Sequence, residues 1–483
     1  MSTIKKLAGQ TAVYGLSSIL GRLLNYLLVP IYTFKGNYDP AEYGIISIFY
    51  AYVAFIVVIL MFGMETTFFR LVNKSKDKEK TFNQAFSIIL IVNAIFLTVI
   101  LLFSQTVANL IGFPQLKTYV IWFAFILIFD ALSSLFMAKL RHEEKPKEFA
   151  IIQLISIGIN IIFNLFFIYW FLQSNRDFGI GFVFLANLLS SAVKPIMLYK
   201  YIVKFRFVWD KVVAKTMILF ALPLLIGGFA GIINETLDRI LLKNIMLKKG
   251  GEVYADTQVG IYSASYKLSI LITLFIQAFR YAAEPSFFAQ EKNKDKDKIY
   301  SKVMTYFVIV VSLIFLVISL NLDIFKWFIP NPEYWEGLKV VPVLLLANVF
   351  LGIYYNQSIW YKLADKTKFG AYIALFGATI TVVLNLILIP TMGYMGAAWT
   401  TLVCYFSMTA LSHYLGQKHY PIKYNLRKVG LFLGASIGLF FIGKLLTFES
   451  FWITFIIHSL LILLYIGLVQ VIENPLKELK RSN

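Results

Sequence analysis

The chain has 483 residues, of which 59% are hydrophobic and 15% are charged. Soluble domains carry roughly 25% charged residues, so a soluble globular protein is excluded. The net charge of +19 does not indicate a nucleic-acid-binding protein, because the basic residues form short clusters between apolar runs and no single basic face. With one cysteine, Cys404, the chain can form neither an internal disulfide nor a cysteine metal cluster.

Apolar runs long enough to cross a bilayer as helices recur along the whole chain. In chain order they predict about fourteen spans, at 9–33, 43–69, 82–111, 118–138, 148–172, 178–199, 214–246, 258–289, 299–321, 338–361, 369–389, 394–416, 428–446 and 451–472. The first run is too long for a signal-peptide core and lacks a clean cleavage site, which predicts a retained span. The connections are too short for an extramembrane catalytic domain. We therefore predict an all-α integral membrane protein that is not an enzyme.

Basic residues gather in every second connection between these spans. The basic connections are 70–80, 139–147, 200–215, 292–302, 362–368 and 418–428. Lys and Arg are concentrated in the cytoplasmic loops of membrane proteins. The alternation therefore predicts an even number of spans with both termini in the cytoplasm.

The two halves of the chain resemble each other at an offset of about 216 residues. Glu42–Ser47, read as EYGIIS, lines up with Gln258–Ser263, read as QVGIYS. Six predicted spans separate the copies, so the repeats run in the same direction through the membrane. We predict a six-helix N-terminal lobe at 1–206, a six-helix C-terminal lobe at 207–420, and two additional helices with a cytoplasmic tail at 421–483. Such parallel repeats place a substrate site between the two lobes.

Ionisable side chains inside spans are costly, so by default each faces a cavity or a partner. As the substrate-binding set of a central cavity we select Arg22, Asp238, Arg239, Lys267, Arg280 and Glu284, with Asp130, Glu235 and Lys194 as secondary candidates. Several of these are three or four residues apart on one helix, so local ion pairs that fix helix register are an alternative to cavity lining. A cavity lined by buried cations favours an anionic ligand. The sequence has no metal-binding or nucleotide-binding motif, and we predict no cofactor.

Taken together, these segments resemble the polysaccharide and O-antigen flippases of the multidrug/oligosaccharidyl-lipid/polysaccharide exporter superfamily. The resemblance covers nearly the whole chain and rests on an ordered set of segments: Val29–Tyr32, Pro40–Gly44, Leu237–Leu242, Val259–Lys267, Phe279–Pro285, Val340–Asn348, Trp360–Thr367 and Gly393–Trp399. It implies two six-helix lobes forming a V, two extra helices, and a central cavity that faces the two sides of the membrane alternately. The resemblance assigns five of the site residues to this cavity: Asp238, Arg239, Lys267, Arg280 and Glu284. Arg22 is selected only because it lies deep in its predicted span.

The resemblance also implies a biological role. The expected substrate is an oligosaccharide on a polyprenyl diphosphate, moved across the bacterial cytoplasmic (inner) membrane for surface polysaccharide biosynthesis, with a polysaccharide polymerase as a candidate partner. Two alternatives stay open. An ion-coupled multidrug exporter would need a cavity dominated by carboxylates, for which Asp130, Glu235 and Asp238 leave room. A membrane polysaccharide polymerase would need a large outer loop, which the sequence lacks.

Overall fold

The computed structural model describes residues 19–21, 23–291 and 293–474. Within these ranges the chain is helical, with short turns and no β-strand, which confirms the predicted all-α class. The chain forms two compact units, unit 1 at Met1–Gly260 and unit 2 at Ile261–Asn483. The predicted lobe boundaries at 206 and 420 remain predictions.

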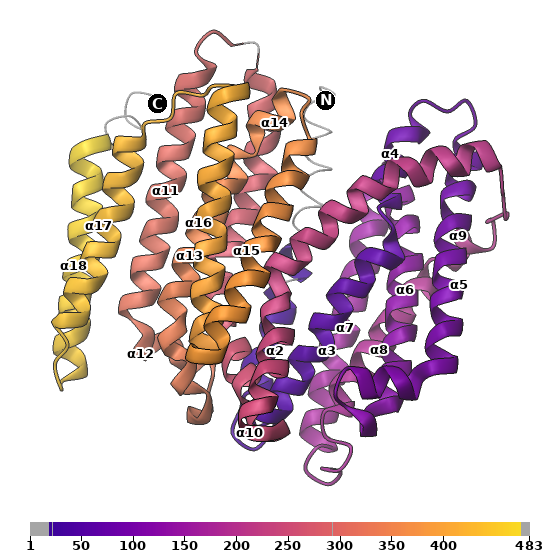
Figure 1. Ribbon diagram of the computed structural model, residues 1–483, viewed down its shortest axis with the longest axis horizontal. Helices are drawn as coiled ribbons and strands as arrows, with labels where there is room; N and C mark the ends of the chain where they lie inside the picture. The colour runs from indigo at the N-terminus through magenta and orange to yellow at the C-terminus, as the bar shows by residue number, and fades with distance from the viewer. Residues whose placement is uncertain (1–18, 22, 292, 475–483) are drawn as a thin grey trace. The chain divides into compact units, whose positions relative to one another are not determined.

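Unit 1 is built from helices that pack mainly on their neighbours in sequence (Figure 1). Helix α6 is central, because it contacts α5, α8 and α3, while α7 packs on α8. The elements are α2 (Leu28–Tyr32), α3 (Pro40–Met61), α4 (Met64–Val72), α5 (Lys78–Leu110), η1 (Pro114–Leu116), α6 (Lys117–His142), α7 (Pro146–Trp170), α8 (Gly181–Met197), α9 (Tyr199–Ile202) and the first part of α10 (Lys211–Gln290).

Unit 2 contains the remainder of α10 and the helices that follow it. Its centre is formed by α13 and α16, with α15 packed on α16, and with α11 joining α13 to α17. The elements are α11 (Lys296–Leu320), α12 (Leu322–Phe325), η2 (Lys326–Phe328), η3 (Pro332–Val340), α13 (Val341–Gln357), α14 (Ile359–Leu363), α15 (Lys368–Met392), α16 (Tyr394–His419), α17 (Leu426–Leu445) and α18 (Phe451–Glu473).

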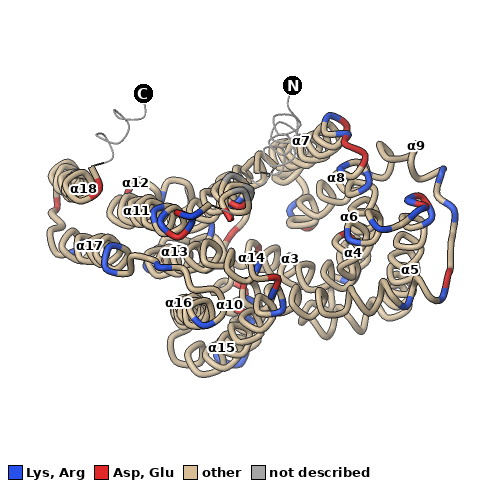
Figure 2. The backbone as a smooth tube through the Cα atoms, turned by 90° about the horizontal axis from the view of Figure 1, so that it is seen from above, with Lys and Arg blue, Asp and Glu red and all other residues tan. Residues whose placement is uncertain are grey.

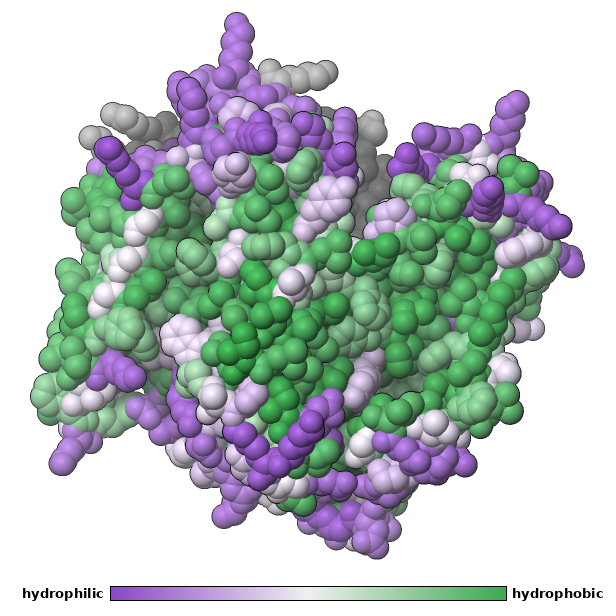
Figure 3. Space-filling model, viewed as in Figure 1, coloured by the Kyte–Doolittle hydropathy of each residue, from purple (hydrophilic) through white to green (hydrophobic). Residues whose placement is uncertain are grey.

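The helix surfaces show a membrane environment. On the drawn face of each unit the middle of the helices is hydrophobic and the ends are hydrophilic (Figure 3), and the backbone carries charged residues only in short stretches (Figure 2). Polar side chains lie inside, such as Asn385 and Thr400 at 0% exposure, while Leu463 and Leu464 are 60% exposed. This is the arrangement expected when helices meet through polar and small residues and turn leucines to lipid.

Ten helices in the described ranges are long and apolar enough to cross a membrane. The predicted number of about fourteen is therefore not confirmed. One reason is that α10 contains two of the predicted spans, and another is that the apolar helix at Gly181–Met197 is shorter than a full span. The first predicted span, 9–33, lies partly outside the described residues.

Helix α10 changes direction at a glycine. Gly251 has φ +80° and ψ −176°, which is far from helical geometry and is accessible mainly to glycine. The kink separates the predicted spans 214–246 and 258–289, and the ribbon reverses near the α10 label (Figure 1).

The first turn of α3 crosses the chain just beyond this kink with the two backbones in contact. A Cβ atom added to Gly44 would collide with the carbonyl of Asp256, and one added to Gly260 would collide with the carbonyl of Pro40. Asp256 follows Pro40, and Gly260 follows Gly44, by 216 residues, the offset of the sequence repeat. The contact is thus reciprocal, as at a local two-fold axis. The repeated glycine therefore has a physical cause, since only glycine permits this close approach.

Candidate functional site

Three of the predicted site residues lie on one stretch of α10 in unit 1. The Oδ1 atom of Asp238 accepts hydrogen bonds from the backbone N–H of Arg239, at 2.8 Å, and from its Nη1, at 3.0 Å. The same Nη1 donates to the backbone carbonyl of Glu235 at 2.8 Å. Asp238 is buried, while Glu235 is exposed. Arg239 therefore pairs with the adjacent Asp238 and contacts Glu235 only at the Glu235 backbone carbonyl. The local ion pair thus joins neighbouring residues and is not the expected pair of residues three or four apart.

The secondary candidates Asp130 and Lys194 form an ion pair between two helices of unit 1. Lys194 Nζ of α8 donates to Asp130 Oδ1 of α6 at 2.8 Å, with both side chains partly exposed. One turn and two turns earlier on α8, Ser191 and Asn187 continue the same polar face. Asn187 Nδ2 donates to the hydroxyl of Tyr50 on α3 at 2.5 Å. This polar face joins α8 to two neighbours, which is the usual role of polar groups between membrane helices.

A further buried ion pair was not predicted from the sequence. Lys243 Nζ donates to Asp256 Oδ1 at 2.6 Å, and the two side chains are 4% and 7% exposed. The amine also lies 3.4 Å from the centre of the Phe113 ring. Thirteen residues of straight helix would separate the pair by about 20 Å, so it forms only because α10 reverses at Gly251. The two adjacent glycines, Gly250 and Gly251, are the sequence signal for such a turn.

Unit 2 brings together Arg280 and Glu284, and adds Lys362. Arg280 Nε lies 3.6 Å from Glu284 Oε1, and the Lys362 amine donates to the same oxygen. The guanidinium of Arg280 also lies over the Tyr355 ring, 4.3 Å from its centre. The side chains of Arg280 and Glu284 are 38% and 35% exposed. One carboxylate shared by two cations leaves a positive charge in excess at a partly open position. The sequence places Lys362 in a basic connection between spans. Nothing in its sequence context distinguishes it from the lysines that mark the cytoplasmic side.

Two further predicted residues are Lys267 and Arg22. Lys267 is partly buried on α10. It precedes Arg280 by thirteen residues, about 20 Å along a helix axis, so the two do not form one cluster within unit 2. Arg22 lies outside the described residues. A single cavity lined by the whole set therefore remains a prediction. In the part of the chain that the structure describes, no group of three or more His, Cys, Asp or Glu residues is placed to hold a metal ion.

The sequence is similar to a protein family and to a membrane protein of another organism. A family model described as "Polysaccharide biosynthesis protein" matches residues 38–287. An uncharacterized membrane protein of Methanocaldococcus jannaschii is 25% identical over 267 residues, which is 51% of this chain and 49% of that protein. The chain thus spans about half the length of this curated relative.

Two solved structures share the fold over most of the chain. The lipid II flippase MurJ, in an inward closed conformation, is 14% identical with a TM-score of 0.74, covering 95% of this chain and 98% of that chain. An inward-facing multidrug resistance MATE family transporter of the MOP superfamily is 14% identical with a TM-score of 0.64, covering 84% and 94%. At this identity the similarity establishes the fold.

Proposed function

Since this chain belongs to the polysaccharide biosynthesis protein family, we propose that it is a flippase for oligosaccharides linked to polyprenyl diphosphate. It moves them by alternating access across the bacterial cytoplasmic (inner) membrane, for surface polysaccharide biosynthesis. In this proposal both termini are cytoplasmic, the lobes at 1–206 and 207–420 enclose the site, and the helices at 421–483 lie outside the repeat. A polysaccharide polymerase that uses the translocated product is a candidate partner.

The observation that carries the proposal is the cluster of Arg280, Lys362 and Glu284 in unit 2. A diphosphate is an anion with several acceptor oxygens, and charge-assisted hydrogen bonds from guanidinium and ammonium groups are the strong class of contact to such groups. The shared carboxylate holds both cations in position, and the Tyr355 ring supports the guanidinium from one side. Because these side chains are partly exposed, a ligand can reach them.

The other selected residues extend this site in the proposal. Arg22, Lys267 and the Asp238–Arg239 pair line further parts of the cavity between the lobes, where they contact the sugar or the diphosphate as the lobes move. The polyprenyl chain stays in the lipid. Rocking of two parallel-repeat bundles about a shared site is the usual form of alternating access in such folds.

The ion pairs of unit 1 argue against the multidrug exporter. A transporter of cationic drugs needs carboxylates that are available to the drug. Of the three candidate carboxylates, Asp130 and Asp238 are each in contact with a cation, at 2.8 and 3.0 Å, and only Glu235 is exposed without such a contact in the structure. A drug would have to displace Lys194 or Arg239 at an energetic cost. A polysaccharide polymerase would need a large outer loop. The connections between the helices are short, so they do not support that alternative.

The proposal is tested with the purified full-length protein in liposomes. A fluorescent polyprenyl-diphosphate oligosaccharide is placed in both leaflets, and a membrane-impermeant quencher reports how much crosses between them. We expect crossing to depend on the protein and to be slower for the same lipid without its diphosphate. Export of a cationic dye by the same liposomes, with no movement of the lipid-linked sugar, would contradict the proposal and favour the exporter.

A further inference from the structure

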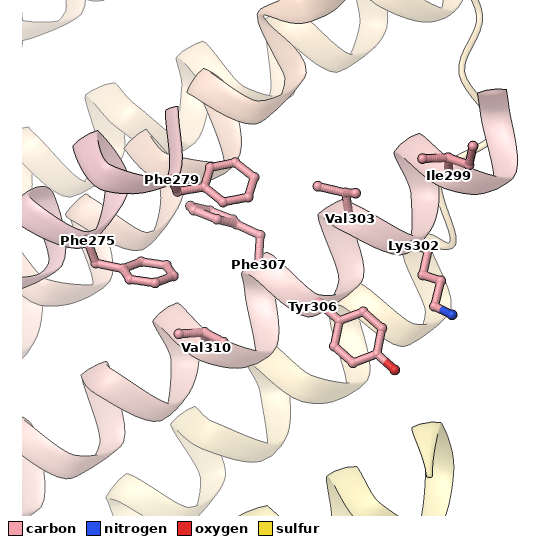
Figure 4. Close-up of a pocket in the computed structure, with 8 residues that line it drawn as sticks. All are labelled: Phe275, Phe279, Ile299, Lys302, Val303, Tyr306, Phe307 and Val310. Atoms are coloured by element: carbon pink, nitrogen blue, oxygen red, sulfur yellow. The ribbon is translucent and has the colours of Figure 1, made fainter. Parts of the chain in front are cut away.

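A cavity of about 400 Å³ lies between α10 and α11 within unit 2 (Figure 4). Six of its lining side chains are apolar: Phe275, Phe279, Ile299, Val303, Phe307 and Val310. The Phe307 ring centre lies 4.5 Å from that of Phe279 and 6.0 Å from that of Phe275. The cavity is therefore walled mainly by aromatic and branched aliphatic side chains.

Two polar residues stand at one side of this cavity. The Lys302 amine and the Tyr306 hydroxyl point to the same side, away from the phenylalanine rings (Figure 4). Lys302 is exposed, and its amine lies 5.9 Å from the centre of the Tyr306 ring. An apolar cavity with a cation and a hydroxyl at one side matches a ligand that has an apolar chain and an anionic head group.

The position of Lys302 along the helix indicates which leaflet supplies the ligand. Helix α11 begins at Lys296, so Lys302 lies in its second turn, near the basic connection 292–302. The charge alternation predicts that this connection is cytoplasmic. The cytoplasmic leaflet carries the anionic lipids that attract Lys and Arg side chains at the membrane surface.

The volume restricts the length of the apolar chain. Ligand pockets commonly measure roughly 300–1,000 Å³, so this cavity suits a small ligand. A methylene group is similar in size to a water molecule, whose share of liquid volume is about 30 Å³, so about a dozen methylenes fill the cavity. That is most of one acyl chain, but only a small part of a polyprenyl chain.

We infer that this cavity binds one acyl chain of an anionic phospholipid, whose phosphate pairs with Lys302. None of Arg280, Glu284 and Lys362 lines this cavity, although Phe279 directly precedes Arg280 on α10. The inference does not depend on the transported substrate. A phospholipid held in this way links α10 to α11 and stabilises unit 2, because a ligand that binds only the folded state raises its stability.

The inference is tested by native mass spectrometry of the delipidated full-length protein, titrated separately with phosphatidylglycerol and with phosphatidylcholine. We expect one tightly held phosphatidylglycerol. Lys302→Gln should weaken phosphatidylglycerol binding about fivefold, the contribution of one basic residue at an anionic surface. It should weaken phosphatidylcholine binding less, because the choline ammonium balances the charge of that phosphate. Val303→Trp fills the cavity and should remove the tight site for both lipids.

Lys298→Gln is the matched control. Lys298 lies one turn before Lys302 on α11, but it pairs with Asp295 at 2.8 Å and does not line the cavity. We expect this variant to bind like the unsubstituted protein. Because Val303→Trp risks misfolding, the Lys302→Gln and Lys298→Gln pair decides the test if the tryptophan variant is not obtained.

Three outcomes would overturn the inference. One is equal phosphatidylglycerol affinity in Lys302→Gln and the unsubstituted protein. Another is unchanged binding in a folded Val303→Trp variant, which would place the lipid elsewhere on the surface. The third is displacement of phosphatidylglycerol by an equal concentration of polyprenyl phosphate, which would assign the cavity to the chain of the transported lipid.

Discussion

Three carboxylates in or near the spans of unit 1 each contact a cation, in the pairs Asp130–Lys194, Asp238–Arg239 and Asp256–Lys243. In unit 2, Glu284 is shared by Arg280 and Lys362. The most buried pair of unit 1 also differs in exposure from the cluster of unit 2. The Lys243 and Asp256 side chains are 4% and 7% exposed, and those of Arg280 and Glu284 are 38% and 35% exposed. The Asp238–Arg239 pair is also largely buried, whereas Asp130–Lys194, at 34% and 22%, is partly exposed. A buried pair stabilises the fold, while an unbalanced, accessible cluster can bind an anion.

The comparison separates two uses of charge in a membrane protein. A buried pair is held by mutual attraction and cannot give up one partner without leaving the other unpaired in a low-dielectric interior. A partly exposed group remains hydrated when its partner is lost. Substitutions at the buried pairs of unit 1 should therefore act first on folding, and those at the Arg280 cluster of unit 2 first on ligand binding.

The largest effect is expected for Lys243→Met. This change leaves the carboxylate of Asp256 buried without its partner, which costs about 3–5 kcal/mol. The yield of folded protein and its melting temperature in detergent should both fall. Adding Asp256→Leu should restore most of the loss, because apolar replacement of both partners of a buried pair is often neutral. A single variant as stable as the unsubstituted protein would remove the distinction between the two units.

Arg280→Ala and Lys362→Ala test the other side of the comparison. Each removes a contact to an ionised ligand, which is worth about 1.5–3 kcal/mol, so substrate affinity should fall about tenfold to a hundredfold. Melting temperature should change little, because both side chains are partly exposed. Lys339→Ala, at a surface pair with Glu336 in unit 2, is the control and should retain full affinity. Loss of folded protein with unchanged affinity would assign the cluster a structural role.

The glycine crossing in unit 1 tests whether backbone packing supports the ion pairs. Gly44→Ala and Gly260→Ala should each cost about 1–3 kcal/mol, the usual range for overpacking a tight contact. Because the collisions are reciprocal, the two losses should be similar. In Gly231→Ala on α10, the added Cβ atom has no other atom within 4 Å. This variant should therefore leave the melting temperature unchanged or raise it slightly. A large loss at only one of the two glycines would contradict the local two-fold symmetry.

The smallest effect is expected at a partly exposed charge of unit 1. Asp210, which directly precedes α10, accepts hydrogen bonds from the backbone N–H groups of Val213 and Val212 in the first turn of that helix. These hydrogen bonds, together with nearby Lys80, lower the pKa of its carboxyl. A lowered folded-state pKa adds stability above the unfolded value, and this is lost as the pH falls through the folded value. Amide exchange in the first turn of α10 should therefore quicken only in strong acid.

Asp210→Asn keeps an acceptor oxygen for the two N–H groups, whereas Asp210→Ala removes it. We expect faster exchange of the first turn at neutral pH only in the alanine variant. Equal exchange in both variants would show that the backbone hydrogen bonds to this side chain do not hold the turn.

Sequence reasoning selected charged groups of unit 1 and unit 2 as a class, because any ionisable side chain in an apolar run needs a partner or a cavity. That these groups bind substrate remains a prediction. It did not select Lys243, whose partner is reached only through the reversal at Gly251. It also did not select Lys362, because a lysine at the end of a span looks the same whether it marks topology or contacts Glu284.

Hydropathy, charge alternation and the repeat were sufficient to predict a multi-pass helical protein with two related halves. These properties are sums over local segments, since each run of residues partitions between water and lipid largely by its own composition. The pairing of charges was decided only by the tertiary structure. Which cation meets which carboxylate depends on helix rotation, on the turn at Gly251 and on the close approach at Gly44 and Gly260. Those are contacts between segments far apart in the chain, which no local pattern specifies.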